Sequence, residues 1–179
     1  MKCVAAMALL IALACHRGGP VRPGKALIER SEGRVVLGPK TTTIIGDPDS
    51  VRAWRIASPF DPNFAELQRT HSRIDEYPIL EEKRVTASAA AQIAAALLDT
   101  RIYGNPTTCI FDPHHALLFR RGADSIIVVI CLKCGDMNIH PSASVGENRT
   151  SEAINGPSGA LYSALDEVFP EARLPRDSM

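Results

Sequence analysis

The sequence predicts an α+β fold, in which an antiparallel sheet built as a meander and hairpin carries one or two helices packed on one face. Three observations predict it. Residues 115–121 and 125–132 are apolar runs separated by a Gly-containing turn, residues 86–100 are Ala-rich, and residues 158–169 carry apolar side chains at helical spacing. Strands adjacent in sequence, with helices outside them, are typical of the α+β class.

The start of the domain is predicted to be extended. β-branched residues fill 34–37 and 41–45, and Gly38-Pro39 separates the two runs. β-branched residues favour strands, and Gly-Pro favours a turn. We therefore expect two short strands here.

Residues 51–57 are predicted to form the next strand, because apolar side chains fall on both faces of an extended chain. Val51 and Ala53 would lie on one face, with Trp54 and Ile56 on the other.

The clearest helix is predicted over residues 86–100, since Ala favours helices and Thr86 can cap the N-terminus. Before it, residues 64–71 fit a short helical turn and residues 77–80 are expected to be extended. The apolar face of the long helix would consist of Ala90, Ile93, Ala94, Leu97 and Leu98.

The second half of the domain is predicted to be a meander that ends in a helix. Residues 126–130 are continuously apolar, as expected of a central strand, and residues 136–140 are expected to add a third strand. The Ser-, Gly- and Asn-rich residues 141–157 are predicted to form a long loop. A closing helix over 158–169 would stop at Pro170.

The N-terminus has the pattern of a secretory signal peptide. Lys2 supplies the positive charge, and residues 4–14 are apolar over a length that is too short to span a membrane. Ala12 and Ala14 are small residues at the two positions that a signal peptidase must admit. Residues 1–14 are therefore predicted to be a signal peptide.

Leu13-Ala14-Cys15 resembles the lipobox of bacterial lipoproteins, although Ala12 stands where that family usually has Leu. The resemblance implies that the chain is cut before Cys15 and that the cysteine is acylated, which would hold the protein at a membrane on the periplasmic or extracellular side. Cleavage without acylation would instead give a secreted, soluble protein. An uncleaved leader that serves as the anchor is a third alternative.

Residues 15–30 are predicted to be a flexible, lipid-anchored tether, because Gly and Pro interrupt both helix and strand there. Residues 31–175 then form a single domain, in keeping with their length. Lys+Arg and Asp+Glu are balanced at 20 each, and the sequence contains no basic run longer than two residues. Both observations argue against nucleic acid as a partner.

The chemistry of the domain is predicted to gather around Cys109, Cys131 and Cys134, with His114 and His115 beside them. Pairing 115–121 with 125–131 would place Cys131 opposite the two histidines, at one end of the sheet. Four interpretations stay open. They are a disulfide from Cys109 to Cys131 or Cys134, a Cys3His zinc site, a C-x2-C redox pair, and three buried free thiols.

The segments Cys109-Ile110-Phe111-Asp112-Pro113 and Cys131-Leu132-Lys133-Cys134 are similar to those of small bacterial proteins of uncharacterised function. Those proteins carry a Cys-x-Phe-x-Pro element, a hairpin and a Cys-x-x-Cys strand end. The resemblance covers about 30 residues. It implies a type of domain and no activity.

The sequence nominates no catalytic residue, because it lacks the common nucleophile, zinc-hydrolase and nucleotide-binding motifs and its carboxylates are dispersed. It favours a membrane-tethered envelope protein with a non-enzymatic binding or structural role. A protein or small molecule of unknown identity would be its partner, and no cofactor is expected. The alternative is an envelope protein that binds zinc or exchanges thiols through the cysteine cluster.

Overall fold

The computed structural model describes residues 37–104, 108–154 and 159–170. The described strands are β1 (Ser50–Ile56), β2 (Arg73–Ile74), β3 (Tyr77–Arg84), β4 (Tyr103–Gly104), β5 (His115–Arg121), β6 (Asp124–Cys131), β7 (Asp136–Pro141) and β8 (Thr150–Ile154). The helices are α1 (Pro39–Gly46), α2 (Phe64–Thr70), α3 (Ala87–Leu98), the 3-10 helix η2 (Thr100–Ile102) and α4 (Gly159–Val168).

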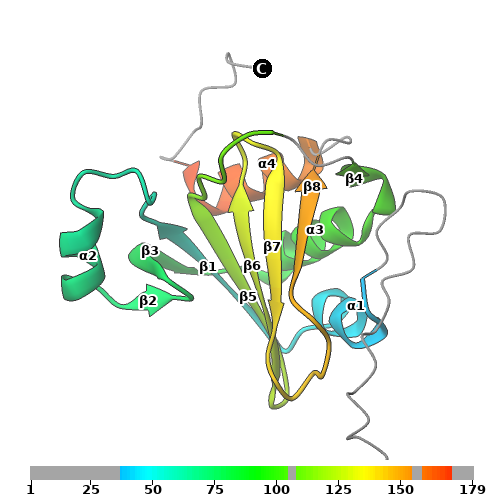
Figure 1. Cartoon of the computed structure of the whole chain (residues 1–179). Coiled ribbons are helices and arrows are strands. Elements are labelled where there is room, and N and C mark those ends of the chain that lie inside the picture. Colours follow the sequence, from blue (N-terminus) through cyan, green and yellow to red (C-terminus); the bar gives the residue numbers. More distant parts are fainter. Residues whose placement is uncertain (1–36, 105–107, 155–158, 171–179) are drawn as a thin grey trace, which may run out of the picture.

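The strands form one antiparallel sheet in the order β2-β3-β1-β5-β6-β7-β8-β4 (Figure 1). The α+β class is therefore confirmed. The predicted hairpin and third strand are present as β5, β6 and β7, which pair in sequence order.

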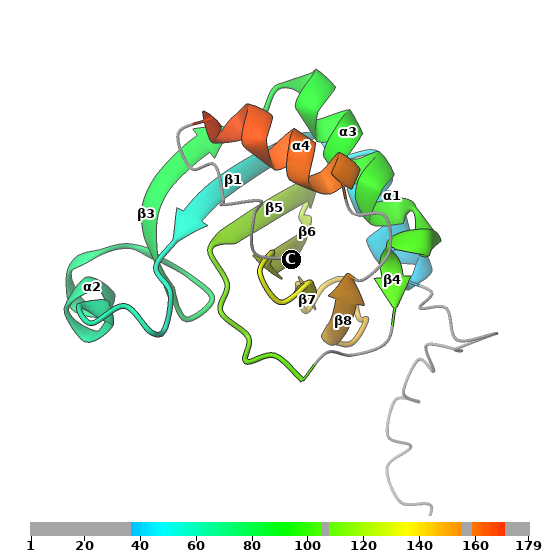
Figure 2. The same ribbon diagram turned by 90° about the horizontal axis from the view of Figure 1, so that it is seen from above.

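The main hydrophobic core lies between the sheet and the helices α1, α3 and α4, which are on one side of the strands (Figure 2). β6 is apolar on both faces. Its residues Ile126, Val128 and Ile130 belong to this main core, whereas Val129 belongs to a second cluster on the opposite face. β6 thus behaves as the central strand that its continuous apolar run predicts.

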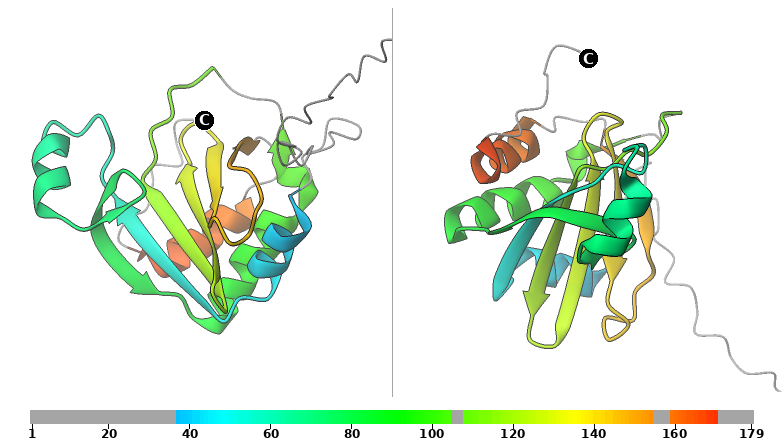
Figure 3. Two further views of the ribbon diagram at one scale, coloured as in Figure 1. Left: turned by 60° about the horizontal axis from the view of Figure 1, so that its bottom comes forward. Right: turned by 90° about the vertical axis from the view of Figure 1, so that its left-hand side faces the viewer.

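The second apolar cluster lies on the sheet face away from α3. It joins Trp54 and Ile56 of β1 to Leu118 and Val129, and Ile74 and Tyr77 of the β2–β3 hairpin are buried with them. The faces predicted for β1 are confirmed, since Val51 and Ala53 belong to the main core instead. Figure 3 shows α2 standing apart from the other helices.

Both predicted long helices are confirmed. α3 begins after Thr86, whose hydroxyl oxygen accepts a hydrogen bond from the backbone nitrogen of Ala89 at 3.2 Å. In α4, Leu161 and Leu165 are buried against the core. The Tyr162 hydroxyl of the same helix donates a hydrogen bond to the carbonyl oxygen of Leu132 at 2.7 Å. The helix is thereby tied to the turn between β6 and β7.

Two local predictions are wrong. Residues 41–45 were expected to be a strand, but they are helical within α1, where Pro39 occupies the first turn and Thr41, Ile44 and Ile45 are buried. Of the other predicted strand, residues 34–37, only Leu37 is described, and it belongs to neither a helix nor a strand. Residues 141–157 were expected to be a loop, yet β8 forms within them by pairing with β7 and β4.

Glu147 explains why the β-branched segment becomes a helix. Its carboxylate accepts hydrogen bonds from the backbone nitrogens of Lys40 and Thr41 at 2.9 and 3.1 Å, and from the Thr41 hydroxyl at 2.6 Å. A carboxylate at a helix N-terminus satisfies amides that have no partner inside the helix and interacts favourably with the helix dipole. The cap comes from a loop about 106 residues further along the chain.

We expect Glu147→Ala to lower the free energy of unfolding by about 2 kcal/mol, because a lost cap costs roughly 1 kcal/mol and the buried Thr41 hydroxyl loses its acceptor. Urea denaturation measures the change. The control is Glu82→Ala, which removes only an exposed ion pair with Arg52. An equal loss in both variants would contradict the capping role.

Within the described ranges, no helix has the length and apolar character needed to span a membrane. The predicted signal peptide, Cys15 and the whole predicted tether fall in residues 1–36, outside the described residues.

Candidate functional site

The cysteine cluster lies where β6 ends and the segment before β5 crosses it. The backbone nitrogen of His114 donates to the carbonyl oxygen of Ile130 at 3.2 Å, and His115 pairs with Ile130 in the hairpin. The predicted register is therefore correct, and Cys131 lies opposite the end of the strand where the histidines are. The turn after Cys131 leads directly into β7.

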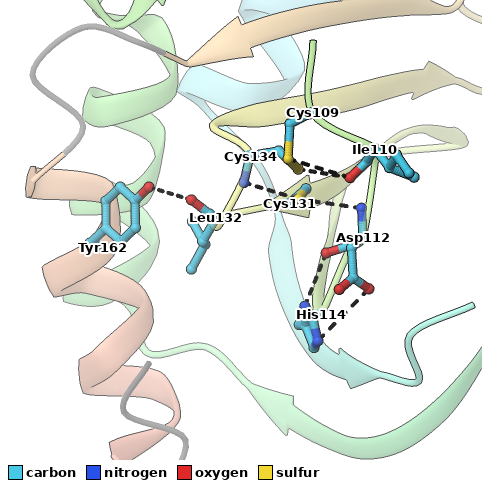
Figure 4. Close-up of a disulfide and its surroundings, with 8 residues drawn as sticks. All are labelled: Cys109, Ile110, Asp112, His114, Cys131, Leu132, Cys134 and Tyr162. Atoms are coloured by element: carbon cyan, nitrogen blue, oxygen red, sulfur yellow. Dashed lines mark hydrogen bonds and ion pairs between the residues drawn. A yellow bond between two sulfur atoms is a disulfide. The ribbon is translucent and has the colours of Figure 1, made fainter. Parts of the chain in front are cut away.

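Cys109 and Cys134 form a disulfide, with their Cα atoms 5.5 Å apart (Figure 4). The disulfide interpretation is confirmed, and of the two pairings that the sequence left open the structure has the one with Cys134. Cys109 is exposed, whereas Cys134 is only 6% exposed. Both sulfur atoms lie near the carbonyl oxygen of Ile110, the Cys134 sulfur at 2.8 Å.

Cys131 is the free thiol of the described residues and is fully buried. Its sulfur accepts hydrogen bonds from the backbone nitrogens of Cys134 at 3.2 Å and of Asp112 at 3.4 Å. Burial raises the pKa of this thiol, and the two backbone hydrogen bonds only partly oppose that effect. Cys131 is therefore a protonated thiol at neutral pH and packs as a small apolar residue.

The turn that carries Cys134 requires a glycine. The backbone nitrogen of Gly135 donates to the carbonyl oxygen of Leu132 at 3.4 Å, and Gly135 has a φ of +65°. A Cβ at this position would lie 2.8 Å from the backbone oxygen of Ile154. The C-x2-C pair thus occupies a tight turn between two strands, and no helix follows it.

Asp112 holds the segment between the disulfide and β5. Its carboxylate accepts a short hydrogen bond from the Ser58 hydroxyl, and the Ser58 oxygen in turn accepts one from the backbone nitrogen of Phe60 at 3.0 Å. The Nδ1 of His114 lies 3.0 Å from the Asp112 carbonyl oxygen, so Nδ1 carries the hydrogen. The His114 Nε2 lies 3.9 Å from the carboxylate.

Sequence reasoning missed the contribution of Ser58, which lies 54 residues before Asp112. The only local signal was Asp112-Pro113, which predicts a turn. Because the Ser58 hydroxyl donates to a carboxylate and not to an imidazole, this network differs from a serine nucleophile paired with a histidine base. It fixes the position of the chain beside the disulfide.

The two candidate histidines are separated. His114 borders the cluster, but the His115 ring packs against Phe169 on the helix-covered side, with ring centroids 5.5 Å apart. Burial is the main reason that the pKa of His115 falls to about 4, and the nearby charges of His114 and Arg55 lower it further. Among the described residues, the His115 Nδ1 has no hydrogen-bond partner.

The third histidine of this half of the chain, His140, lies in β7, at the end remote from the cysteines. Its Nδ1 is 3.2 Å from a carboxylate oxygen of Asp75 in the turn between β2 and β3. Burial lowers the pKa of His140, and the Asp75 carboxylate opposes that shift. This pair connects the β2–β3 hairpin to the centre of the sheet.

In the described part of the chain, no three His, Cys, Asp or Glu side chains are arranged to hold a metal ion. Two of the thiolates in the predicted Cys3His set are joined as a disulfide here, so a zinc site would require their reduction. Zinc binding by the reduced protein stays a prediction.

A groove runs along the disulfide. It is lined by Phe60, Cys109, Ile110, Asp112, Lys133 and Cys134. Phe60 is 60% exposed and Ile110 is 72% exposed, so the groove that contains the disulfide presents two large apolar side chains to solvent.

Comparisons with protein families, with curated proteins and with solved structures find no match for this chain.

Proposed function

We propose that this chain is exported from a bacterial cell, is anchored to the membrane by acyl chains on Cys15, and binds a partner through its α+β domain. The observation that carries the proposal is the Cys109–Cys134 disulfide together with the apolar leader. Disulfides form and persist in the oxidising environment outside the cytoplasm. A leader that delivers the chain to such an environment is consistent with the disulfide that the domain contains.

A binding role is supported by how the reactive side chains near the disulfide are used. Ser58 and Asp112 hydrogen-bond to each other, Cys131 is buried, and His115 packs against Phe169 on the opposite face. Each of these groups stabilises the local structure. The groove beside the disulfide instead offers exposed apolar surface, which often marks an interaction site.

Growth of a bacterial host with labelled palmitate tests the anchor. We expect the wild-type chain to incorporate the label and to sediment with membranes, and Cys15→Ser to lose both properties. Acyl chains contribute roughly 0.8 kcal/mol per buried methylene, which makes the difference in partitioning large.

The matched control is Cys3→Ser, which changes the cysteine inside the leader and should leave labelling of Cys15 intact. An unlabelled mature protein that is freely soluble would contradict the anchor. A cytosolic protein that keeps Met1 would contradict export altogether.

A further inference from the structure

We propose that the Cys109–Cys134 disulfide exchanges with the thiol of a protein segment in which apolar side chains flank a cysteine. The groove beside the disulfide would seat those side chains. This proposal deepens the binding role proposed above and rests on it, but it does not depend on acylation of Cys15. It names the class of partner, a peptide segment that presents an unpaired thiol.

The disulfide has one accessible side. Cys109 is exposed, and Cys134 is 6% exposed, so an external thiol reaches Cys109 first. Cys109 precedes β5 in a segment without helix or strand from residue 108 to residue 114. It can therefore be released without breaking a backbone hydrogen bond between paired strands. Exposed disulfides are in general the more labile ones.

The apolar surface of the described chain is concentrated at this disulfide. Three large hydrophobic side chains are exposed among the described residues, and two of them, Phe60 and Ile110, line the same groove. The third, Leu80, is in β3 and does not line it. A disulfide that shares a groove with two exposed apolar side chains selects for a ligand that carries both a thiol and apolar neighbours.

The exchange is a single substitution at sulfur. The external thiol loses its proton, and the thiolate attacks the Cys109 sulfur, forming a mixed disulfide. The bond between Cys109 and Cys134 breaks, and its electron pair leaves with the Cys134 sulfur, which takes up a proton from solvent. One disulfide is consumed and one is formed, so the step needs no added oxidant or reductant.

Cys131 does not compete with the external thiol. Cys131 lies close to Cys134, since its sulfur accepts a hydrogen bond from the Cys134 backbone nitrogen. However, the Cys131 thiol is fully buried and protonated. A thiol must ionise before it attacks a disulfide. The internal rearrangement that would join Cys131 to Cys134 is therefore slow beside attack from outside.

The test uses the oxidised full chain with Cys3→Ser and Cys15→Ser, which leaves only the three internal cysteines. It is mixed with either of two short peptides of equal length, one with Leu and Phe around a central cysteine and one with Ser and Gly. Mass spectrometry follows the mixed disulfide and locates it. We expect adducts on Cys109, formed about tenfold faster with the apolar peptide, which corresponds to roughly 1.4 kcal/mol of docking energy.

Two matched variants assign that preference to the groove. Phe60→Ser combined with Ile110→Ser should bring the rates of the two peptides close together, whereas Leu80→Ser should keep the tenfold difference. All three side chains are exposed, so none of the substitutions empties the core. Cys131→Ala should leave the rates unchanged.

Equal rates for the two peptides in the wild-type sequence, adducts on Cys134, or no adduct with either peptide would each overturn the proposal. A version of the apolar peptide with serine in place of cysteine separates this failure from failure of the binding role. If the serine peptide binds the groove but the cysteine peptide forms no mixed disulfide, the binding role stands and the exchange proposal is wrong.

Discussion

Reduction of the Cys109–Cys134 disulfide is expected to lower the free energy of unfolding by roughly 3 kcal/mol. The two cysteines are 25 residues apart and enclose the β5–β6 hairpin. Closing a loop of this length restricts the unfolded chain far more than the folded one. For a domain of this size, such a loss is a large part of the total stability.

Urea denaturation with and without a phosphine reductant measures the effect, and Cys109→Ser with Cys134→Ser should reproduce it without reductant. The experiment is best done in a Cys131→Ala background, because unfolding frees the buried thiol to shuffle. In the wild-type domain, Cys131 should resist alkylation until denaturant is added, since it is fully buried. Equal midpoints for the oxidised and reduced forms would contradict a stabilising disulfide.

The pattern of apolar residues predicted the centre of the fold because local and tertiary preferences agree there. β6 is apolar throughout and is buried on both faces, and α3 combines Ala-rich sequence with the Thr86 cap. The prediction failed where a distant partner decides the structure. The helix over 41–45 depends on the carboxylate of Glu147, which no local window of sequence contains.

β8 was missed for a related reason. Residues 150–154 are short and begin with polar side chains, so they show little strand character on their own. They become a strand because β7 and the two-residue β4 supply hydrogen-bonding partners on both sides. Ladder pairing between neighbouring strands can thus override weak local preference.

The sequence predicted which cysteine residues meet at the site, but not how the cysteines pair. The hairpin register placed Cys131 and His114 at the same end of the sheet, as the structure does. The register could not decide which cysteine pairs with Cys109, because that depends on the turn around Gly135. Nor could it include Phe60, which the chain brings to the groove from the segment before α2.

Lowering the pH from about 6.5 to about 4 is expected to reduce stability by roughly 3 kcal/mol through His115 alone. Burial holds the folded-state pKa near 4, below the value of about 6.5 in the unfolded chain. The unfolded state therefore binds a proton in this range while the folded state does not. The stabilisation is complete above pH 6.5 and is lost as the pH falls toward 4.

The test compares urea denaturation at pH 7 and pH 4.5 for the wild-type chain and His115→Leu. Leucine has a similar size, can pack against Phe169 and carries no ionisable group, so this variant should lose much less stability on acidification. His71→Leu, at an exposed position, should behave like the wild type. Effects of acidification at positions other than residue 115 are shared by the compared proteins and cancel in the comparison. If His115→Leu keeps the full pH dependence, the buried ring of His115 is not its source.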